Sequence, residues 1–93
     1  QMVAPAMKGA MGNCYAQLGQ LDKASSMLLK AADEADNTTL SPIYLKQAGE
    51  ILVKQGKYDD AIKAYTSIKE KYFRSYQAMD IDKYIEQAKL LKK

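Results

Sequence analysis

The sequence contains no histidine and only one cysteine, Cys14, among its 93 residues. Histidine is the commonest general base and metal ligand, so a Ser-His-Asp or Cys-His arrangement cannot be built within this chain. One cysteine cannot form an internal disulfide. The five glycines are scattered and form no phosphate-binding loop. We therefore predict that the chain is not an enzyme and that it has no catalytic residues, no metal site and no cofactor.

Arginine and long apolar runs are also scarce. The net charge is +3, from 14 basic and 11 acidic residues, and Arg74 is the only arginine. Nucleic-acid binding is typical of chains with a denser stripe of basic residues, so we predict no nucleic-acid partner. No apolar run approaches the roughly 20 residues that span a bilayer, and we predict no direct membrane contact by this segment. The chain opens at Gln1 inside a helix-like pattern, which indicates a C-terminal fragment of a longer protein.

What the sequence does contain is an internal repeat. Two of its stretches are similar, GNCYAQLGQLDKA at 12–24 and GEILVKQGKYDDA at 49–61. The glycines and the final alanine of the first stretch recur 37 residues later, at the same places in the second. A glycine between two amphipathic stretches is typical of a left-handed turn that ends one helix before the next begins. The repeat therefore predicts two helical hairpins of the same design.

These patterns predict an all-α fold of five helices. Gly19 should end the first helix, and Gly56 should end the third. Ser41 is predicted to be the N-cap of the third helix, with Pro42 as its first residue, and Ser75 to be the N-cap of the fifth. No glycine turn follows the fifth helix, which should cover the last hairpin as a terminal cap. The predicted helices span about 3–18, 22–35, 42–55, 59–72 and 76–91.

The residues at these positions resemble the tetratricopeptide repeat family, whose repeats are helix–turn–helix units of about 34 residues. The resemblance implies a right-handed α-α superhelix in a single domain over 1–93. Repeat 1 would span about 5–38, repeat 2 about 42–75 and the capping helix 76–91. The matching residues are Gly12, Tyr15, Gly19, Ala24, Leu28 and Ala31 in the first repeat and Gly49, Gly56, Tyr58, Ala61, Tyr65 and Ile68 in the second.

The sequence departs from the family pattern in its period of 37, which places three extra residues in the loop before Ser41. The tryptophan typical of the first helix is replaced by Lys8 and Leu45. The segments NCYAQLGQLDKA, DNTTLSP and QAMDIDKYIEQAK also resemble segments of bacterial proteins that carry such repeats behind an N-terminal membrane anchor. That resemblance implies a location on the periplasmic side of the inner membrane.

The resemblance implies a protein–protein interaction scaffold that binds a peptide or protein on the concave face of the stacked hairpins. The last helix could add Tyr76, Met79 and Lys83 to that face. A solvated face without a specific ligand is the alternative. The predicted partner-binding residues are Asn13, Gln17, Lys46, Gln47, Glu50 and Lys54.

A row of apolar residues on the first helix suggests a second role. Its counterpart on the third helix should pack on the preceding hairpin, whereas the first helix has no hairpin before it. An exposed apolar row of this size is typical of an interface. We expect this row to pack against an upstream repeat or against a second copy of the chain. In the second case the protein would be a homo-oligomer. The row comprises Val3, Met7, Met11, Cys14 and Leu18.

Overall fold

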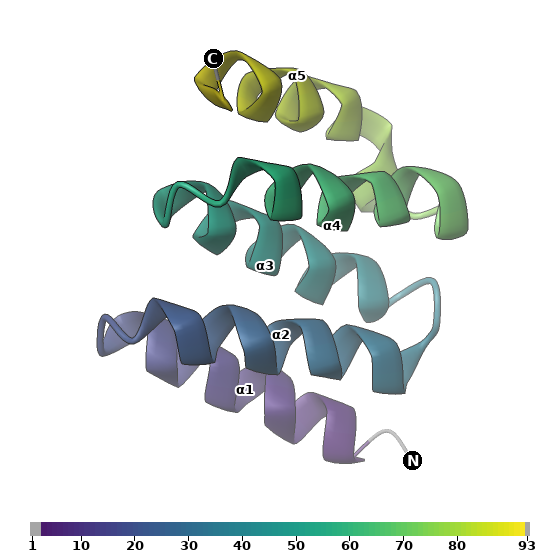
Figure 1. The fold of residues 1–93 in the computed structure, drawn as a ribbon. Coiled ribbons are helices and arrows are strands. Elements are labelled where there is room, and N and C mark those ends of the chain that lie inside the picture. Colours follow the sequence, from purple (N-terminus) through teal and green to yellow (C-terminus); the bar gives the residue numbers. More distant parts are fainter. Residues whose placement is uncertain (1–2, 93) are drawn as a thin grey trace.

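The protein is described by a computed structural model that covers residues 3–92, and this part of the chain is helical and contains no strand. Consecutive helices pack against one another in a row (Figure 1). This confirms the predicted all-α class and hairpin arrangement. The elements are α1 (Val3–Gln17), α2 (Leu21–Ala35), α3 (Ser41–Lys54), α4 (Tyr58–Lys71), the 3-10 helix η1 (Tyr76–Asp80) and α5 (Ile81–Lys92).

The glycine turns have the predicted left-handed geometry, with φ of 80° at Gly19 and 78° at Gly56. After α1, the amide of Gln20 donates to the carbonyl of Tyr15 at 2.9 Å, and that of Gly19 to Ala16 at 3.1 Å. These bonds satisfy carbonyls that the helix end would otherwise leave unpaired. The Gly56 turn has the same two hydrogen bonds, each 37 residues further on. The two hairpins therefore share one turn design.

The start of α3 differs from the prediction, because Ser41 is its first residue and not its N-cap. The fully buried Ser41 hydroxyl instead donates to the carbonyl of Ala32 at 2.7 Å and accepts the Asn37 amide at 3.0 Å. The N-cap is Leu40, and the Asn37 side-chain oxygen accepts the Leu40 amide at 2.7 Å within the loop. The longer loop is thus tied to the end of α2 by side-chain hydrogen bonds.

Within each hairpin, a glycine lets the two helices approach closely. A Cβ added at Gly12 would lie 2.8 Å from Cγ of Leu28, and one added at Gly49 would lie 2.4 Å from Cε1 of Tyr65. Both distances are well below ordinary contact, so only glycine fits without movement of the neighbour. Close approach of the partner helix therefore explains why a glycine lies inside each of these helices.

The core runs along the middle of the stack. Tyr58 and Ile62 of α4 are only half-buried. The Tyr72 hydroxyl at the end of α4 donates to the Asp36 carboxylate at 2.8 Å, which joins the second hairpin to the loop before it. The buried apolar residues of α2, α3 and α4 are Ala24, Leu28, Ala31, Ala32, Tyr44, Leu45, Ala48, Ile51, Leu52, Ala61, Ala64, Tyr65 and Ile68.

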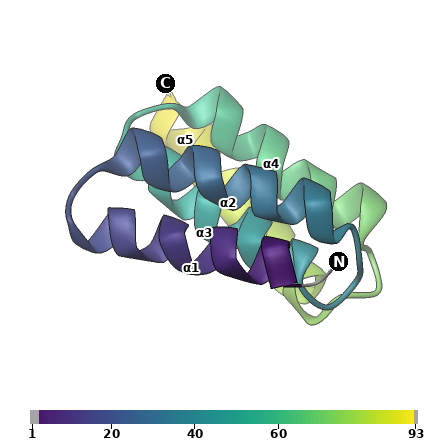
Figure 2. The ribbon, with the colours of Figure 1, turned by 90° about the horizontal axis from the view of Figure 1, so that it is seen from below.

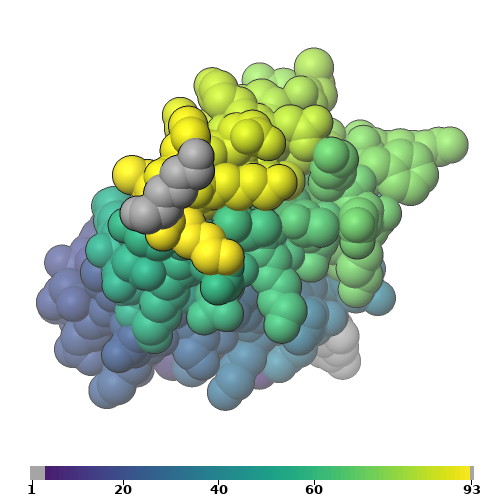
Figure 3. All heavy atoms as spheres, turned by 45° about the horizontal axis from the view of Figure 1, so that its top comes forward, coloured from purple at the N-terminus to yellow at the C-terminus, as the bar shows by residue number. Residues whose placement is uncertain are grey.

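The C-terminal part differs from the single helix predicted over 76–91. Ser75 is the predicted cap, and its Oγ accepts the Ala78 amide at 3.2 Å, but it opens η1 rather than an α-helix. The α-helix α5 begins only at Ile81. Viewed from below, α1, α2 and α4 run in roughly parallel directions, and α3 and α5 lie behind them (Figure 2). In Figure 3, α5 lies across the atoms of α3 and α4, and the chain between α4 and α5 projects at one edge.

Candidate functional site

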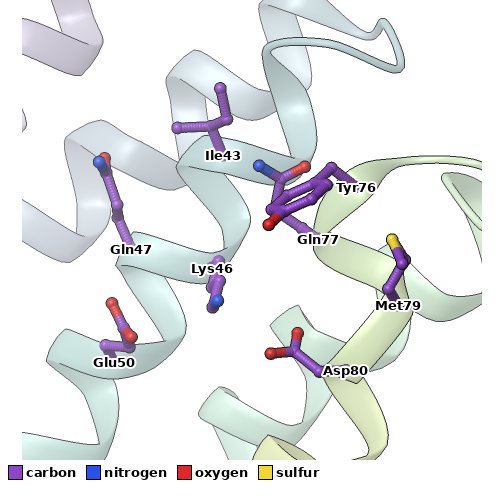
Figure 4. A pocket seen from close by; sticks show the side chains of 8 residues that line it. All are labelled: Ile43, Lys46, Gln47, Glu50, Tyr76, Gln77, Met79 and Asp80. Carbon is purple, nitrogen blue, oxygen red and sulfur yellow. The ribbon is translucent and has the colours of Figure 1, made fainter.

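α3 has one row of side chains that the core does not use. Two of its rows are buried, one through Tyr44 and Ala48 and the other through Leu45 and Leu52. The third row faces η1, and the two elements enclose a hollow of about 500 Å³ (Figure 4). Its walls are formed by Ile43, Lys46, Gln47 and Glu50 of α3 and Tyr76, Gln77, Met79 and Asp80 of η1.

A second hollow, of about 450 Å³, lies further along α3 and is bounded by α4 and α5 on its other side. Glu50 borders both hollows, so they adjoin each other. We call the two together the α3–α5 groove. The second hollow is lined by Glu50, Val53, Lys54, Tyr65, Tyr84, Gln87, Ala88 and Leu91.

Aromatic rings and charges meet in this groove. The Lys46 ammonium lies 4.4 Å from the centre of the Tyr84 ring, and the Lys83 ammonium lies 5.4 Å from it. Tyr84 in turn packs on Tyr65 at 5.8 Å between ring centres. Burial raises the pKa of Tyr65 to about 12, and the negative charge of Glu50 adds to this rise. The floor of the groove is therefore an aromatic pair with lysine placed over one ring.

The rim of the groove exposes large apolar side chains. Tyr76 is 81% and Met79 is 79% exposed, and both belong to η1. Residues three apart eclipse each other on a 3-10 helix, so these two side chains share one edge of it. Exposed apolar side chains beside a concave, mixed polar surface are typical of a binding site.

The structure brings four of the predicted partner-binding residues into the groove: Lys46, Gln47, Glu50 and Lys54. Asn13 and Gln17 are exposed on α1 and line neither hollow. Their register nevertheless matches that of Glu50 and Lys54, 37 residues later. The binding role of all six stays a prediction.

Sequence reasoning missed Gln77, Asp80, Tyr84 and Gln87 as lining residues. It also placed Lys83 on the concave face, whereas neither hollow includes this residue. The useful signal was the spacing of Gln77 and Asp80, which puts both on one edge of a 3-10 turn. That signal becomes readable only once the 3-10 conformation is known.

The apolar row of α1 is exposed. Met7 is 60% and Leu18 is 70% exposed, and Met11 and Cys14 are exposed as well. The Val3 side chain lies outside the described residues. The positions 37 residues after Met7, Met11 and Cys14 are Tyr44, Ala48 and Ile51, which are all buried. The same helix face is therefore covered in the second hairpin and open in the first.

Other site types find little support in residues 3–92. This part of the chain has no group of three or more His, Cys, Asp or Glu side chains that could hold a metal ion. Each helix described is too short or too polar to cross a membrane. The candidate site is thus the surface formed by α3, η1 and α5.

The comparisons with known proteins point to the second hairpin. Residues 45–71 match the family model of the tetratricopeptide repeat. This range covers most of α3 and all of α4, and the match supports the family that the sequence resembles. Repeats of this family are interaction modules that generally mediate contacts between proteins and typically catalyse no reaction. No curated protein and no solved structure matched the chain. The resemblance to membrane-anchored bacterial proteins stays a prediction.

Proposed function

Because this chain carries a tetratricopeptide repeat, we propose that it is a non-catalytic scaffold that binds a peptide or protein segment in the α3–α5 groove. The observation that carries the proposal is the pair of adjoining hollows between α3 and the C-terminal elements. In this proposal the two hairpins and the terminal helix form one domain over residues 1–93. α4 supports the groove from behind, while α3, η1 and α5 make the contacts.

The composition of the groove favours a polypeptide ligand. Gln87 offers an amide group that can pair with peptide backbone, and Lys46 and Glu50 offer charges of both signs. Tyr76 and Met79 supply the apolar area that a partner side chain can cover. A few such exposed anchors usually contribute most of the binding free energy at an interface.

Selection of phage-displayed peptides against the full chain, followed by fluorescence anisotropy, tests the proposal. We expect the selected peptides to bind the unmodified chain and to lose at least about tenfold in affinity with the pair Tyr76→Ala and Met79→Ala, because hot-spot truncations cost more than about 1.4 kcal/mol. The matched control is Phe73→Ala with Leu90→Ala, two other exposed apolar residues that line neither hollow. Circular dichroism checks that both variants fold.

Two results would contradict the proposal. One is that no peptide is enriched over an empty matrix. The other is that the control pair weakens binding as much as the groove pair, since binding would then depend on general apolar exposure.

Self-association through α1 is the second candidate function, and it rests on the open row of Met7, Met11, Cys14 and Leu18. The buried state of the matching α3 positions indicates that a helix can cover this face. One helix face provides less than the ~800 Å² per partner that a stable interface usually buries, so the expected association is weak. Val3 would extend the row at its start.

Sedimentation equilibrium over a wide concentration range tests this second function. Met11→Lys should abolish any association of the unmodified chain and leave the monomer folded, since Met11 is exposed. Met79→Lys is the matched control, because it makes the same change at an exposed methionine of η1 and should leave association intact. A strictly monomeric chain at high concentration would exclude self-pairing.

A further inference from the structure

The first hollow of the groove is lined by two carboxylates that form no ion pair within residues 3–92. Glu50 reaches it from α3 and Asp80 from η1, and the Asp80 carboxylate points toward α3 (Figure 4). Within residues 3–92, five ion pairs are formed, and neither Glu50 nor Asp80 belongs to any of them. Free carboxylates on facing walls of a concave site lower the local potential and attract a cation.

Lys46 is the only cation among the residues that line this hollow. Its ammonium lies 4.4 Å from the Tyr84 ring centre, where the face of the ring attracts it. It forms no ion pair with Glu50 or Asp80 in the described part of the chain. The hollow therefore carries a net charge of −1, from two carboxylates and one ammonium, in a chain whose net charge is +3.

The wall on the η1 side adds an aromatic and a thioether surface to these charges. The exposed Tyr76 ring offers a face on which a flat cation can stack, and Met79 and Ile43 offer apolar area on either side. The volume of about 500 Å³ falls within the range typical of small-ligand pockets, which is enough for more than one side chain.

We infer that this hollow takes an arginine side chain of the partner segment together with an apolar residue next to it. The inference rests on the proposed function, since it assigns the chemistry of the same groove. The guanidinium suits the site better than an ammonium, because it is planar, can stack on Tyr76 and has five donors for the Glu50 and Asp80 oxygens. The adjacent apolar side chain covers Met79 and Ile43.

Two short peptides that differ only in charge provide the test. The probes are acetyl-Gly-Ser-Leu-Arg-Ser-Gly-amide and the same peptide with glutamate in place of arginine, each titrated into the 15N-labelled full chain. Amide shifts in α3 and η1 report binding at millimolar peptide. We expect the arginine peptide to bind at least about tenfold more tightly, since hydrogen bonds to charged groups contribute that much. Added salt should reduce the difference.

Three variants assign the effect to the hollow. Glu50→Gln with Asp80→Asn keeps the shapes and removes both charges, so the preference for arginine should disappear. Asp60→Asn with Glu70→Gln makes the same change at two exposed acidic residues of α4 and should leave the preference unchanged. Lys46→Met should strengthen binding of the arginine peptide, because it removes the competing cation.

Equal or tighter binding of the glutamate peptide would overturn the inference, because Lys46 would then govern the site. A preference that survives removal of both carboxylates would overturn it too, as would the absence of saturable shifts in α3 and η1. These failures differ from a failure of the proposed function. Peptides from the phage selection would still bind the groove if only the arginine preference were wrong, whereas the scaffold proposal falls if they do not bind there.

Discussion

Replacement of Gly49 by alanine sets two opposing effects against each other. Alanine favours a helix interior by about 1 kcal/mol relative to glycine. Against this, the new Cβ would lie 2.4 Å from Cε1 and 2.8 Å from Cζ of Tyr65. Carbon atoms in ordinary contact are about 3.5–4.0 Å apart, so the ring has to retreat by about 1 Å.

The surroundings of Tyr65 decide which effect is larger. The residue is only 2% exposed, and the Tyr84 ring lies 5.8 Å away between ring centres. These neighbours hold the Tyr65 ring in place, although the ring also borders the second hollow of the groove. Overpacking of a core typically costs about 1–3 kcal/mol, so we expect Gly49→Ala to lower the free energy of unfolding by about 1 kcal/mol net. Urea unfolding followed by circular dichroism measures this difference.

A double-mutant cycle assigns the loss to the contact. In a Tyr65→Leu background the clash is gone, and Gly49→Ala should become neutral or stabilising, with a coupling energy of about 2 kcal/mol. Gly56→Ala is the control, because its Cβ would meet nothing within 4 Å and its cost comes from the φ of 78°. That cost should be the same in both backgrounds. The reasoning is refuted if Gly49→Ala stabilises the unmodified chain or costs the same in both backgrounds.

Three further predictions concern ionisable groups and hydrogen bonds. Since the pKa of Tyr65 is raised from 10.0 to about 12, the folded state should lose at most about 3 kcal/mol of stability as pH rises from 10 to 12. Tyr65→Phe should reduce this loss, as measured by urea unfolding at about pH 9 and about pH 11.5. The hydrogen bond from Lys57 lowers the pKa of Asp22, so the stabilisation from this pair should be present at neutral pH and lost as pH falls through the lowered pKa. Lys57→Met should raise the pKa of Asp22 in a carboxyl NMR titration. An unchanged pKa would disprove the pairing. Tyr72→Phe should cost about 1–2 kcal/mol by removing the bond to Asp36, whereas Tyr76→Phe on the exposed ring should cost little.

Most of the fold could be predicted because the turn residues carry strong local signals. Gly19 and Gly56 adopt the left-handed conformation that other residues avoid, and each helix end adjoining them lies within two residues of the prediction. The predicted N-cap at Ser41 was wrong. A serine before a proline matches the N-cap pattern, but a local pattern cannot show that the Ser41 hydroxyl is buried against Ala32. Tertiary hydrogen bonding overrode the local preference.

The candidate site could be predicted only in part. The α3 residues follow from helical periodicity, since the row left over by two buried rows must face outward. Of the η1 residues, Tyr76 and Met79 were predicted, but Gln77 and Asp80 were not, because spacings of three and four fit an α-helix and a 3-10 helix almost equally well. The change at Ile81 from one helix type to the other redirects Asp80 and Gln77 into the hollow, and no sequence signal marked it.

The hydrogen bond between Tyr72 and Asp36 has a consequence for how the stack comes apart. It joins the end of one hairpin to the loop that follows the other, a sequence separation of 36 residues. In repeat proteins, stability is approximately the sum of terms within each repeat and terms between neighbours. The bond between Tyr72 and Asp36 is a term between neighbours, so it favours unfolding of both hairpins in one cooperative transition. Without it, the first hairpin, whose α1 row is exposed in the described residues, would be the unit that frays in hydrogen exchange.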